Sequence, residues 1–413
     1  MIRIAGSDFP VELATPAADV DVNVGAGALR PGEPLGVYVH FPFCGVRCPY
    51  CDFAVDTRAG IPHDAYADAV VDEIGARRGW YEGAGPLASI YFGGGTPGLW
   101  RADALARVVE AARAAFDAAG AANAPEITVE VNPGESDEAH LRALRGHGVN
   151  RLSIGVQAFD DRLLRGLGRN HDAAAGPACV RAARAAGFDN VSIDLMFGVP
   201  EQSFDDWRRA VDLAIGLAPD HVSAYALTVE RGTAFGSLAR AGRLARPDDE
   251  AVAAMFEHAR AAFAAAGIEP YEISSYARRD RRSCHNSLYW SLGPYLGVGA
   301  SAASFRPLVD GSAWRFSDPR ATDVYLRDRT PRHVERRTAA DLENEAVWLG
   351  LRTAAGIDRA VHRARHGVDP IVGRDLEVER AVAAGWLIVD DVHVQLTPAG
   401  VLFADEVAAR LWK

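Results

Sequence analysis

Three cysteines lie within eight residues of one another, at Cys44, Cys48 and Cys51, in a segment that follows the apolar run Leu35 to Pro42. Thiolate sulfur is a strong ligand for zinc and iron, and closely spaced cysteines are typical of metal sites. Three thiolates can hold three irons of a four-iron cluster and leave the fourth iron open to an exchangeable ligand. The spacing therefore predicts a [4Fe-4S] cluster where a substrate or cofactor binds at the open iron.

Two other uses of these cysteines compete with a cluster. A structural zinc site usually needs four Cys or His ligands, commonly as two separated pairs. The chain has no second pair of this kind, although His40, four residues before Cys44, could complete a tetrahedral set. The cysteines could also be incidental core residues, which is what we expect of Cys179. Disulfides are disfavoured because five cysteines in 413 residues is sparse usage, and this pattern favours a reducing, cytoplasmic compartment.

The composition of the chain disfavours several classes of function. The chain has 44 basic and 55 acidic residues and a net charge of −11, which disfavours nonspecific binding to nucleic acid. No apolar stretch approaches the length of a membrane-spanning helix, and the amino terminus lacks the pattern of a signal peptide. The only lysine is Lys413, so neither a Walker-type phosphate loop nor a Schiff-base lysine is present. We expect a soluble protein that binds no nucleic acid.

Short β-branched runs alternate with long amphipathic stretches, which is typical of βα repeats and a parallel sheet. We expect strands at 35–40, 88–92, 126–131, 151–155, 190–196, 221–227 and 269–273, and helices that include 62–79, 101–119, 203–216 and 249–266. Six or seven such repeats predict an α/β fold with a barrel or partial barrel. In that fold the chemistry collects at the C-terminal ends of the strands, where the cysteine segment and the glycine-rich segment 93–97 both lie.

The pattern divides the chain into four parts. We expect a poorly ordered tail at 1–33, a core barrel at 34–300, a linker at 301–335 and a small C-terminal domain at 336–413. For the last part the sequence predicts helices near 339–354, 358–366 and 375–384, a strand pair at 386–389 and 392–396, and a final helix. Helices followed by a hairpin resemble a winged helix. Residues 338–413 carry eight basic and twelve acidic residues, which favours a packing or lid role over DNA binding.

The three cysteines, on a loop after the first strand of a βα repeat, resemble those of the radical S-adenosylmethionine (SAM) superfamily. The resemblance runs from about Leu35 to Phe305 and weakly beyond. It implies a partial (β/α)6-type barrel in which the amine and carboxylate of SAM chelate the open iron. In that superfamily, reduction of the cluster cleaves SAM to a 5′-deoxyadenosyl radical.

Seven blocks in the same order are similar to the oxygen-independent coproporphyrinogen-III oxidase group. They are His40-Phe-Pro-Phe-Cys44, Tyr50-Cys51-Asp-Phe53, Phe92-Gly-Gly-Gly-Thr-Pro97, Glu130-Val-Asn-Pro133, Ser153-Ile-Gly-Val-Gln157, Leu167-Gly-Arg169 and Asp194-Leu-Met-Phe-Gly-Val-Pro200. The resemblance implies SAM contacts at Tyr38, Tyr50, Gly94, Gly95, Thr96, Glu130, Gln157, Arg169 and Asp194. The residues themselves also suggest contact with a ligand. The glycines that follow the strand at 88–92 would let the backbone approach a ligand closely, although they could instead form a plain βα turn. Glu130 and Asp194 should point into the barrel mouth, although each could instead be a hydrogen-bonded structural acid.

Phe53 marks a departure from the decarboxylases of this group, which carry a fourth cysteine at that position. The replacement resembles the haem chaperone branch, as does the HNxxY motif formed by His285, Asn286 and Tyr289, which implies haem binding there. Neutral imidazole is a good axial ligand for haem iron, although Cys284 could compete, and a surface histidine in a turn is the alternative. We expect a haem chaperone that receives electrons from a donor, delivers haem to acceptors such as respiratory proteins, and could dimerise. Coproporphyrinogen decarboxylation and radical methyl transfer are the enzyme alternatives.

Overall fold

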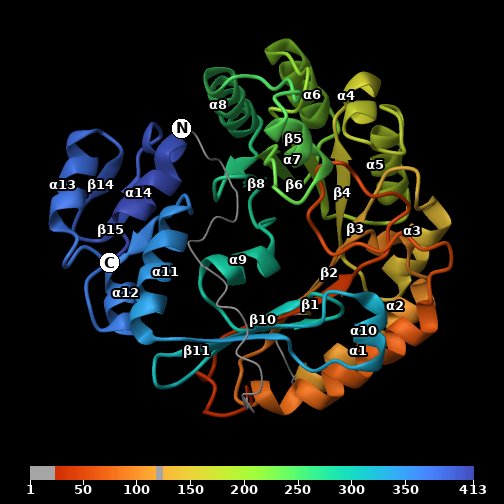
Figure 1. Ribbon diagram of the computed structural model, residues 1–413, viewed down its shortest axis with the longest axis horizontal. Helices are drawn as coiled ribbons and strands as arrows, with labels where there is room; N and C mark the ends of the chain where they lie inside the picture. Colours follow the sequence, from red (N-terminus) through yellow and green to blue (C-terminus); the bar gives the residue numbers. More distant parts are fainter. Residues whose placement is uncertain (1–23, 118–123) are drawn as a thin grey trace.

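The computed structural model describes residues 24–117 and 124–413, and the barrel occupies most of them (Figure 1). Six parallel strands form its wall: β1 (Leu35–Phe41), β2 (Leu87–Gly94), β3 (Glu126–Val131), β4 (Arg151–Gln157), β5 (Val191–Phe197) and β6 (His221–Ala226). They are rich in β-branched residues buried on both faces, as expected for a parallel sheet covered by helices. The predicted partial barrel of six βα repeats is therefore confirmed.

The helices of the barrel lie outside the strands (Figure 1). They are α1 (His63–Arg77), α2 (Ala102–Phe116), α3 (Glu138–Gly146), α4 (Asp161–Gly166), α5 (Ala175–Ala185), α6 (Phe204–Gly216), α7 (Ala234–Arg240) and α8 (Asp249–Ala265), with short 3-10 turns at Arg78–Tyr81 and Pro97–Leu99. Local signals set several of their ends. At α6, for example, Ser203 and Asp206 form a reciprocal capping box.

A seventh parallel repeat does not form. Residues 269–273, expected as a strand, contribute only β7 (Glu269–Pro270), which pairs with β8 (Ser275–Ala277) in the antiparallel direction. The neighbouring pairing of β8 with β6 is also antiparallel. The chain then passes through the short helix α9 (Cys284–Trp290) and returns to the opposite edge, where β9 (Tyr295–Val298) pairs parallel with β1. The hairpin of β7 and β8, which lies beside β6, takes the place of the expected repeat because the chain turns back after Pro270.

Residues 301–335 are not a linker, contrary to our prediction. They form β10 (Ala303–Pro307), β11 (Ala313–Ser317), α10 (Thr322–Arg327) and the beginning of β12 (His333–Arg337), and these strands extend the barrel sheet by antiparallel pairing. The described sheet has the order β12-β11-β10-β9-β1-β2-β3-β4-β5-β6-β8-β7. The segment is fixed to the barrel by a buried ion pair in which Arg77 lies 2.5 Å from Asp318.

The amino-terminal prediction is also corrected in part. Residues 1–23 of the expected tail lie outside the described residues. In residues 24–33, however, Val24 and Leu29 are buried, and Leu29 forms a bridge with Leu308. The guanidinium of Arg306 donates to the carbonyl oxygens of Ala26 and Gly27. These contacts order the segment against β10.

The C-terminal domain lies beside the barrel and matches its predicted elements (Figure 1). It contains α11 (Ala339–Leu351), β13 (Ile357–Asp358), α12 (Arg359–His366), α13 (Asp375–Ala383), β14 (Leu387–Val389), β15 (His393–Leu396), a 3-10 turn at Gly400–Phe403 and α14 (Ala404–Arg410). The three strands form a separate antiparallel sheet of order β13-β15-β14, as in a winged helix. The domain has its own apolar core, and α11 also contacts α9 of the barrel.

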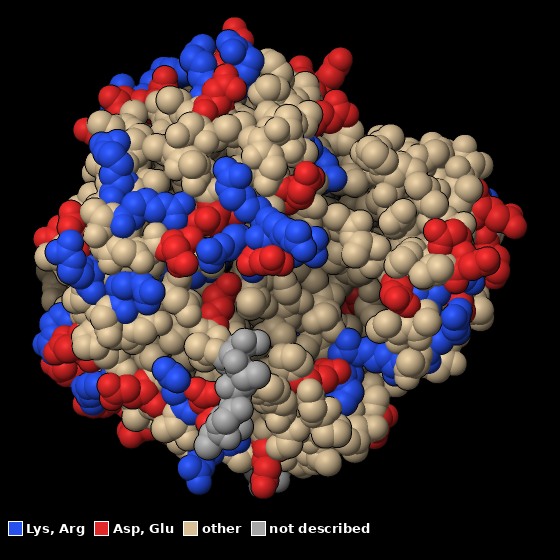
Figure 2. Space-filling model, turned by 180° about the vertical axis from the view of Figure 1, so that it is seen from behind, with Lys and Arg blue, Asp and Glu red and all other residues tan. Residues whose placement is uncertain are grey.

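Surface charge on the face opposite the view of Figure 1 is mixed. Figure 2 shows basic and acidic side chains interspersed over this face, with uncharged surface between them. Such a surface differs from the continuous basic patch that is typical of nucleic-acid binding. Within the described residues, no helix has both the length and the apolar character needed to cross a membrane.

Candidate functional site

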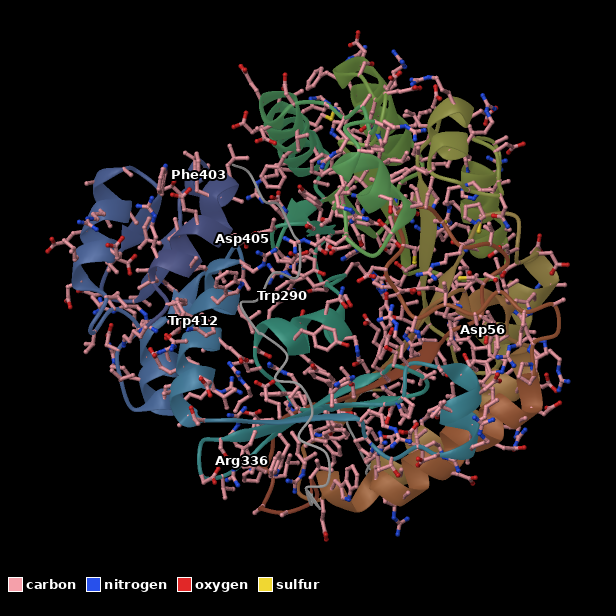
Figure 3. All side chains as sticks on the ribbon, viewed as in Figure 1. Asp56, Trp290, Arg336, Phe403, Asp405 and Trp412 are labelled. Carbon is pink, nitrogen blue, oxygen red and sulfur yellow. The ribbon has the colours of Figure 1, made fainter. Side chains whose placement is uncertain are left out.

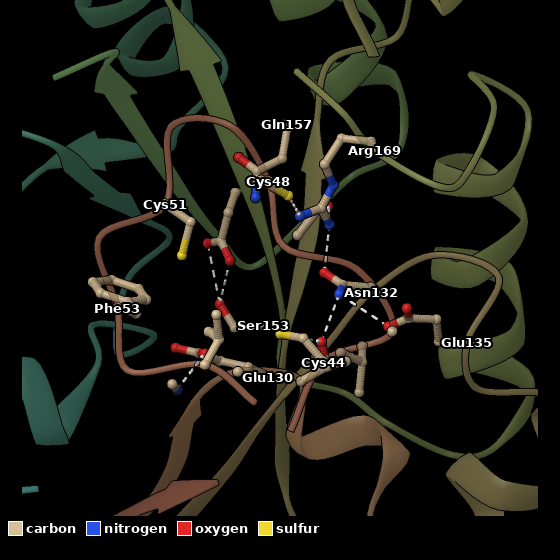
Figure 4. A pocket seen from close by; sticks show the side chains of 18 of the residues that line it. Cys44, Cys48, Cys51, Phe53, Glu130, Asn132, Glu135, Ser153, Gln157 and Arg169 are labelled. Carbon is tan, nitrogen blue, oxygen red and sulfur yellow. Dashed lines mark hydrogen bonds between the residues drawn. The ribbon is translucent and has the colours of Figure 1, made fainter. Parts of the chain in front are cut away.

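The three clustered cysteines line one cavity at the C-terminal ends of the barrel strands (Figure 4). Cys44, Cys48 and Cys51 are free thiols and half-buried, and the cavity that they border has a volume of about 320 Å³. Other residues of its wall come from β2, β3, β4, β5 and β6. The structure thus brings together the cysteine segment and the strand ends, as the sequence predicted for the site of chemistry.

Two of the sulfurs contact polar side chains from the segments that follow β2 and α4. The Sγ of Cys44 lies 3.4 Å from Thr96 Oγ1, and the Sγ of Cys48 lies 3.8 Å from Nη1 of Arg169. Burial raises the pKa of the Cys44 thiol to about 11 and also raises the pKa of Cys51. A cationic iron site would stabilise the thiolates that burial disfavours. The residues present therefore fit a cluster held by three cysteines.

In this geometry His40 is not available as the fourth ligand of a zinc site. His40 is buried, and both of its ring nitrogens have partners away from the cysteines: Tyr38 Oη at 3.1 Å and the Ala54 carbonyl at 3.0 Å. Burial lowers the pKa of this imidazole to about 4, so it is neutral at physiological pH. Instead, His40 links β1 to Ala54, which follows the cysteines in the sequence.

The glycine-rich segment after β2 packs directly on the cysteine segment. Gly94 has a φ of +108°, and a Cβ there would lie 2.5 Å from the His40 ring. A Cβ on Gly95 would lie 2.6 Å from the Phe43 carbonyl oxygen, whereas the backbone N–H of Gly95 donates to Phe41. Only glycine permits this approach. Both glycines also line the cavity, so the same backbone packs on the cysteine segment and is accessible to a ligand.

Two predicted acids lie in the cavity wall. Glu130 accepts hydrogen bonds from Tyr91 Oη at 2.8 Å and from the backbone N–H of Gly94 at 3.2 Å. Asp194 accepts from Ser153 Oγ at 3.0 Å. Burial raises the pKa of Glu130 to about 7 and also raises the pKa of Asp194. Both acids border the cavity, which is where the sequence predicted that their side chains point.

The end of β4 carries backbone strain at a predicted site residue. Gln157 has a φ of +64°, which is uncommon outside glycine and costs about 1–3 kcal/mol. Its Oε1 accepts a hydrogen bond of 2.8 Å from Tyr225 on β6, and both side chains border the cavity. Strain of this kind persists where the surrounding contacts hold it, and it is frequent at binding sites.

The other predicted SAM contacts divide into two groups. Tyr50, Thr96 and Arg169 border the cavity. Tyr38 does not: it lies behind the wall, stacked at 6.2 Å on Tyr91, and burial raises its pKa. In this structure Tyr38 supports the wall residue Tyr91 and is not itself on the surface of the cavity.

Several cavity residues were not singled out from the sequence. They are Arg151, Ser153, Ser223 and Tyr225 on the strands, and Asn132, Glu135 and Asn170 on the segments that follow β3 and α4. Asn132 connects the site: it donates to Thr96 Oγ1 and Glu135 Oε2, both at 2.9 Å, and accepts from Arg169 at 2.5 Å. The period of two along a strand places Asn132 on the same face as Glu130, and this signal could have identified it.

The HNxxY motif lies on α9, with its histidine buried. The ring of His285 stacks on Tyr91 at 5.1 Å, Ser89 Oγ lies 2.8 Å from its Nδ1, and Tyr289 Oη lies 2.8 Å from its Nε2. Burial lowers the pKa of His285 to about 3. Neither nitrogen is available to iron in this conformation, so the geometry does not support the expected haem contact at His285. Asn286 borders the cavity lined by the three cysteines, which we call the cluster cavity, and Cys284 is exposed.

Comparisons with known proteins identify the domains and the fold. Residues 38–214 match the radical SAM superfamily, and residues 338–403 match the HemN C-terminal domain. The fold is similar to coproporphyrinogen III oxidase (HemN) from Escherichia coli, with a TM-score of 0.77, 23% identity and coverage of 94% of this chain and 92% of that one. At this identity the likeness concerns the fold.

Curated relatives are more similar in sequence. A protein named heme chaperone HemW from Synechocystis is 36% identical over 78% of this chain and 79% of its own length. Heme chaperone HemW from Escherichia coli is 33% identical over 91% of this chain and 97% of its own length. Radical S-adenosyl methionine domain-containing protein 1, mitochondrial, from Bos taurus is also 33% identical, over 95% of this chain and 90% of its own length. The chain belongs to the HemW family of the radical SAM superfamily.

Proposed function

We propose that this protein is a cytoplasmic haem chaperone that carries a SAM-ligated [4Fe-4S] cluster, binds haem and delivers it to acceptor proteins, respiratory ones among them. The observation that carries the proposal is the cysteine segment itself. It supplies three sulfurs to the cavity and places Phe53, 63% exposed, where the decarboxylases resembled by this sequence have a fourth cysteine. The names of the curated relatives support the haem function.

The residues of the cavity have separate tasks in this proposal. Cys44, Cys48 and Cys51 would hold the cluster, which when bound supplies an iron with an open coordination position. Thr96 lies 3.4 Å from the sulfur of Cys44, and Arg169 lies 3.8 Å from the sulfur of Cys48, so both can stabilise the negative charge of the thiolates. The buried acids, the glycine backbone and Gln157 would orient SAM, whose amine and sulfonium are matched by carboxylates.

The test compares chaperone and decarboxylase on the same preparation. Anaerobically reconstituted protein is titrated with haem, and the haem-loaded protein is mixed with apomyoglobin as a model acceptor. In a parallel sample, reductant, SAM and coproporphyrinogen III are added. We expect a Soret shift on haem binding, transfer of haem to apomyoglobin and no loss of coproporphyrinogen. Consumption of coproporphyrinogen, or the absence of a Soret shift, would contradict the proposal.

A further inference from the structure

A second cavity lies between the barrel and the C-terminal domain, with a volume of about 500 Å³. Trp290 at the end of α9 forms one side of it, and Trp348, Leu349 and Arg352 on and after α11 form the other. Figure 3 shows Trp290 and Asp405 on facing sides of this boundary. The cavity falls within the range of about 300–1,000 Å³ that is typical of pockets for organic ligands.

This cavity continues into the cluster cavity. Tyr50, Cys51, Phe53 and Tyr225 line both. The side chain of Phe53 therefore stands at the boundary between them, where it is 63% exposed. A ligand in the second cavity would cover Phe53 and lie next to the sulfur of a cluster cysteine.

The chemistry of the walls suits a broad, flat and apolar ligand. Trp290, Trp348 and Phe53 offer aromatic surface, and aromatic walls favour planar molecules. The indole Nε1 of Trp290 is buried without a hydrogen-bond partner among the described residues, so it can donate to a ligand. Trp348 is itself supported by Trp412, whose ring packs on it edge to face at 6.1 Å.

The charged groups of this cavity set the orientation of a ligand. Arg352 lies over the Trp290 ring at 5.9 Å and forms an ion pair with Asp405. Asp52 and Glu230 are also at the wall and would repel a carboxylate placed deep among them. Arg352 is only 10% exposed and is already paired with Asp405, so the walls favour an apolar ring system inside the cavity and leave the carboxylates of an amphipathic ligand in solvent.

We propose that this interdomain cavity binds the haem macrocycle, with its faces against the tryptophans and its propionates toward solvent. The inference rests on the proposed chaperone function and identifies where haem is held. It also agrees with the burial of His285, whose two nitrogens are bonded within the protein. Haem in this cavity would contact both the cysteine segment and the C-terminal domain.

The test fills the cavity without removing a polar group. Leu349→Trp adds bulk at the cavity wall, and Leu376→Trp makes the same substitution on α13 at a side chain that is 59% exposed outside it. Holoprotein of each variant is titrated with haem by Soret absorbance, after iron content, SAM binding and circular dichroism show that it folds. His285→Gln is the third variant, because it removes a possible axial ligand.

We expect Leu349→Trp to weaken haem binding by about tenfold or more, and Leu376→Trp to bind as the native protein does. Trp290→Phe, which removes only the indole donor, should weaken binding by about three- to tenfold. Native haem affinity in a folded Leu349→Trp protein would overturn the assignment of this cavity and leave the chaperone function standing. Loss of binding only in His285→Gln would move haem to α9, and a native protein that binds no haem would overturn the chaperone function itself.

Discussion

Asn132 accepts a hydrogen bond of 2.5 Å from Arg169, the residue whose other guanidinium nitrogen lies against the sulfur of Cys48. The same asparagine donates to Thr96, which contacts Cys44. One amide from the end of β3 thus positions the polar partners of two cluster cysteines. Hydrogen bonds to cluster sulfurs are among the factors that set a cluster's reduction potential.

The first prediction concerns this arrangement. Asn132→Ala should lower the reduction potential of the reconstituted cluster by about 40 to 90 mV, because about 1–2 kcal/mol of stabilisation of the reduced, more negative state is lost. The measurement is an anaerobic redox titration followed by electron paramagnetic resonance. Asn170→Ala is the control, since Asn170 borders the same cavity and its side chain donates to Glu135, while within the described part of the chain it makes no hydrogen bond to Thr96 or Arg169. Equal potentials in both variants would contradict a positioning role for Asn132.

The cysteine assignment predicts a loss of iron. Replacing Cys44, Cys48 or Cys51 singly by alanine should reduce bound iron and sulfide well below four of each per chain and remove the visible absorbance of the cluster. Cys284→Ala should retain both, because that exposed thiol lies outside the cavity. Iron and sulfide assays on anaerobically prepared protein give the answer, and full iron content in the Cys48→Ala protein would exclude the three-cysteine site.

SAM binding should depend on the ionisation of Glu130. Burial raises the pKa of this carboxyl to about 7, so its charged form, which attracts a cationic ligand, grows as pH rises through 7. We expect SAM affinity to increase between pH 6 and pH 8, and Glu130→Gln to remove most of this increase and weaken binding about tenfold at pH 8. Calorimetric titration measures both effects. Glu135→Gln, also at the cavity wall, controls for the loss of one negative charge, and an unchanged pH profile in Glu130→Gln would refute the assignment.

Acid stability should reflect the buried imidazole of His285. Its folded-state pKa of about 3 lies below the ordinary value of 6.5, so its contribution to stability is complete above pH 6.5 and declines as pH falls below 6.5, where the unfolded chain takes up the proton first. From pH 6 to pH 5 this residue alone should remove about 1 kcal/mol from the free energy of unfolding. Urea unfolding of His285→Gln should show a shallower decline, whereas the exposed His147→Gln should follow the native protein; parallel curves for all three would contradict this prediction.

The buried ion pair of Arg77 with Asp318 ties the segment after β11 to α1, together with the 2.7 Å pair between Arg77 and Glu73. Arg77→Ala leaves two carboxylates buried without their cation and should lower the free energy of unfolding by about 3–5 kcal/mol. The neighbouring exposed Arg78→Ala should change it by less than about 0.5 kcal/mol. Chemical denaturation distinguishes the two, and similar midpoints would show that Arg77 is not a structural link.

The sequence was most informative where one local signal decided the structure. The β-branched runs expected as strands at 126–131 and 190–196 became buried parallel strands, and the helix expected at 203–216 became α6 (Phe204–Gly216). The βα repeats likewise predicted that the cysteine segment and the glycine-rich segment lie at one end of the barrel, because parallel strands bring their C-terminal ends to one side of a sheet.

Predictions failed where tertiary contacts outweighed local pattern. Residues 301–335 were expected to be a linker, yet β10 forms there by pairing with β9 and β11. The Arg306 guanidinium also donates to the backbone carbonyls of Trp80, Ala26 and Gly27. Nothing near His285 in the sequence indicates Ser89 as a partner, since 196 positions separate them. Long-range polar contacts of this kind are invisible to periodicity.

The single lysine of the chain has a practical consequence. Lys413 follows Trp412, and the Trp412 ring packs on Trp348 in the wall of the interdomain cavity. A fluorophore coupled to this amine would sit one residue from an indole that supports the cavity wall. Amine-reactive dyes label most proteins at many side chains, but here they would attach to one side chain and the terminal α-amine, and the dye on Lys413 would report on occupancy of the cavity.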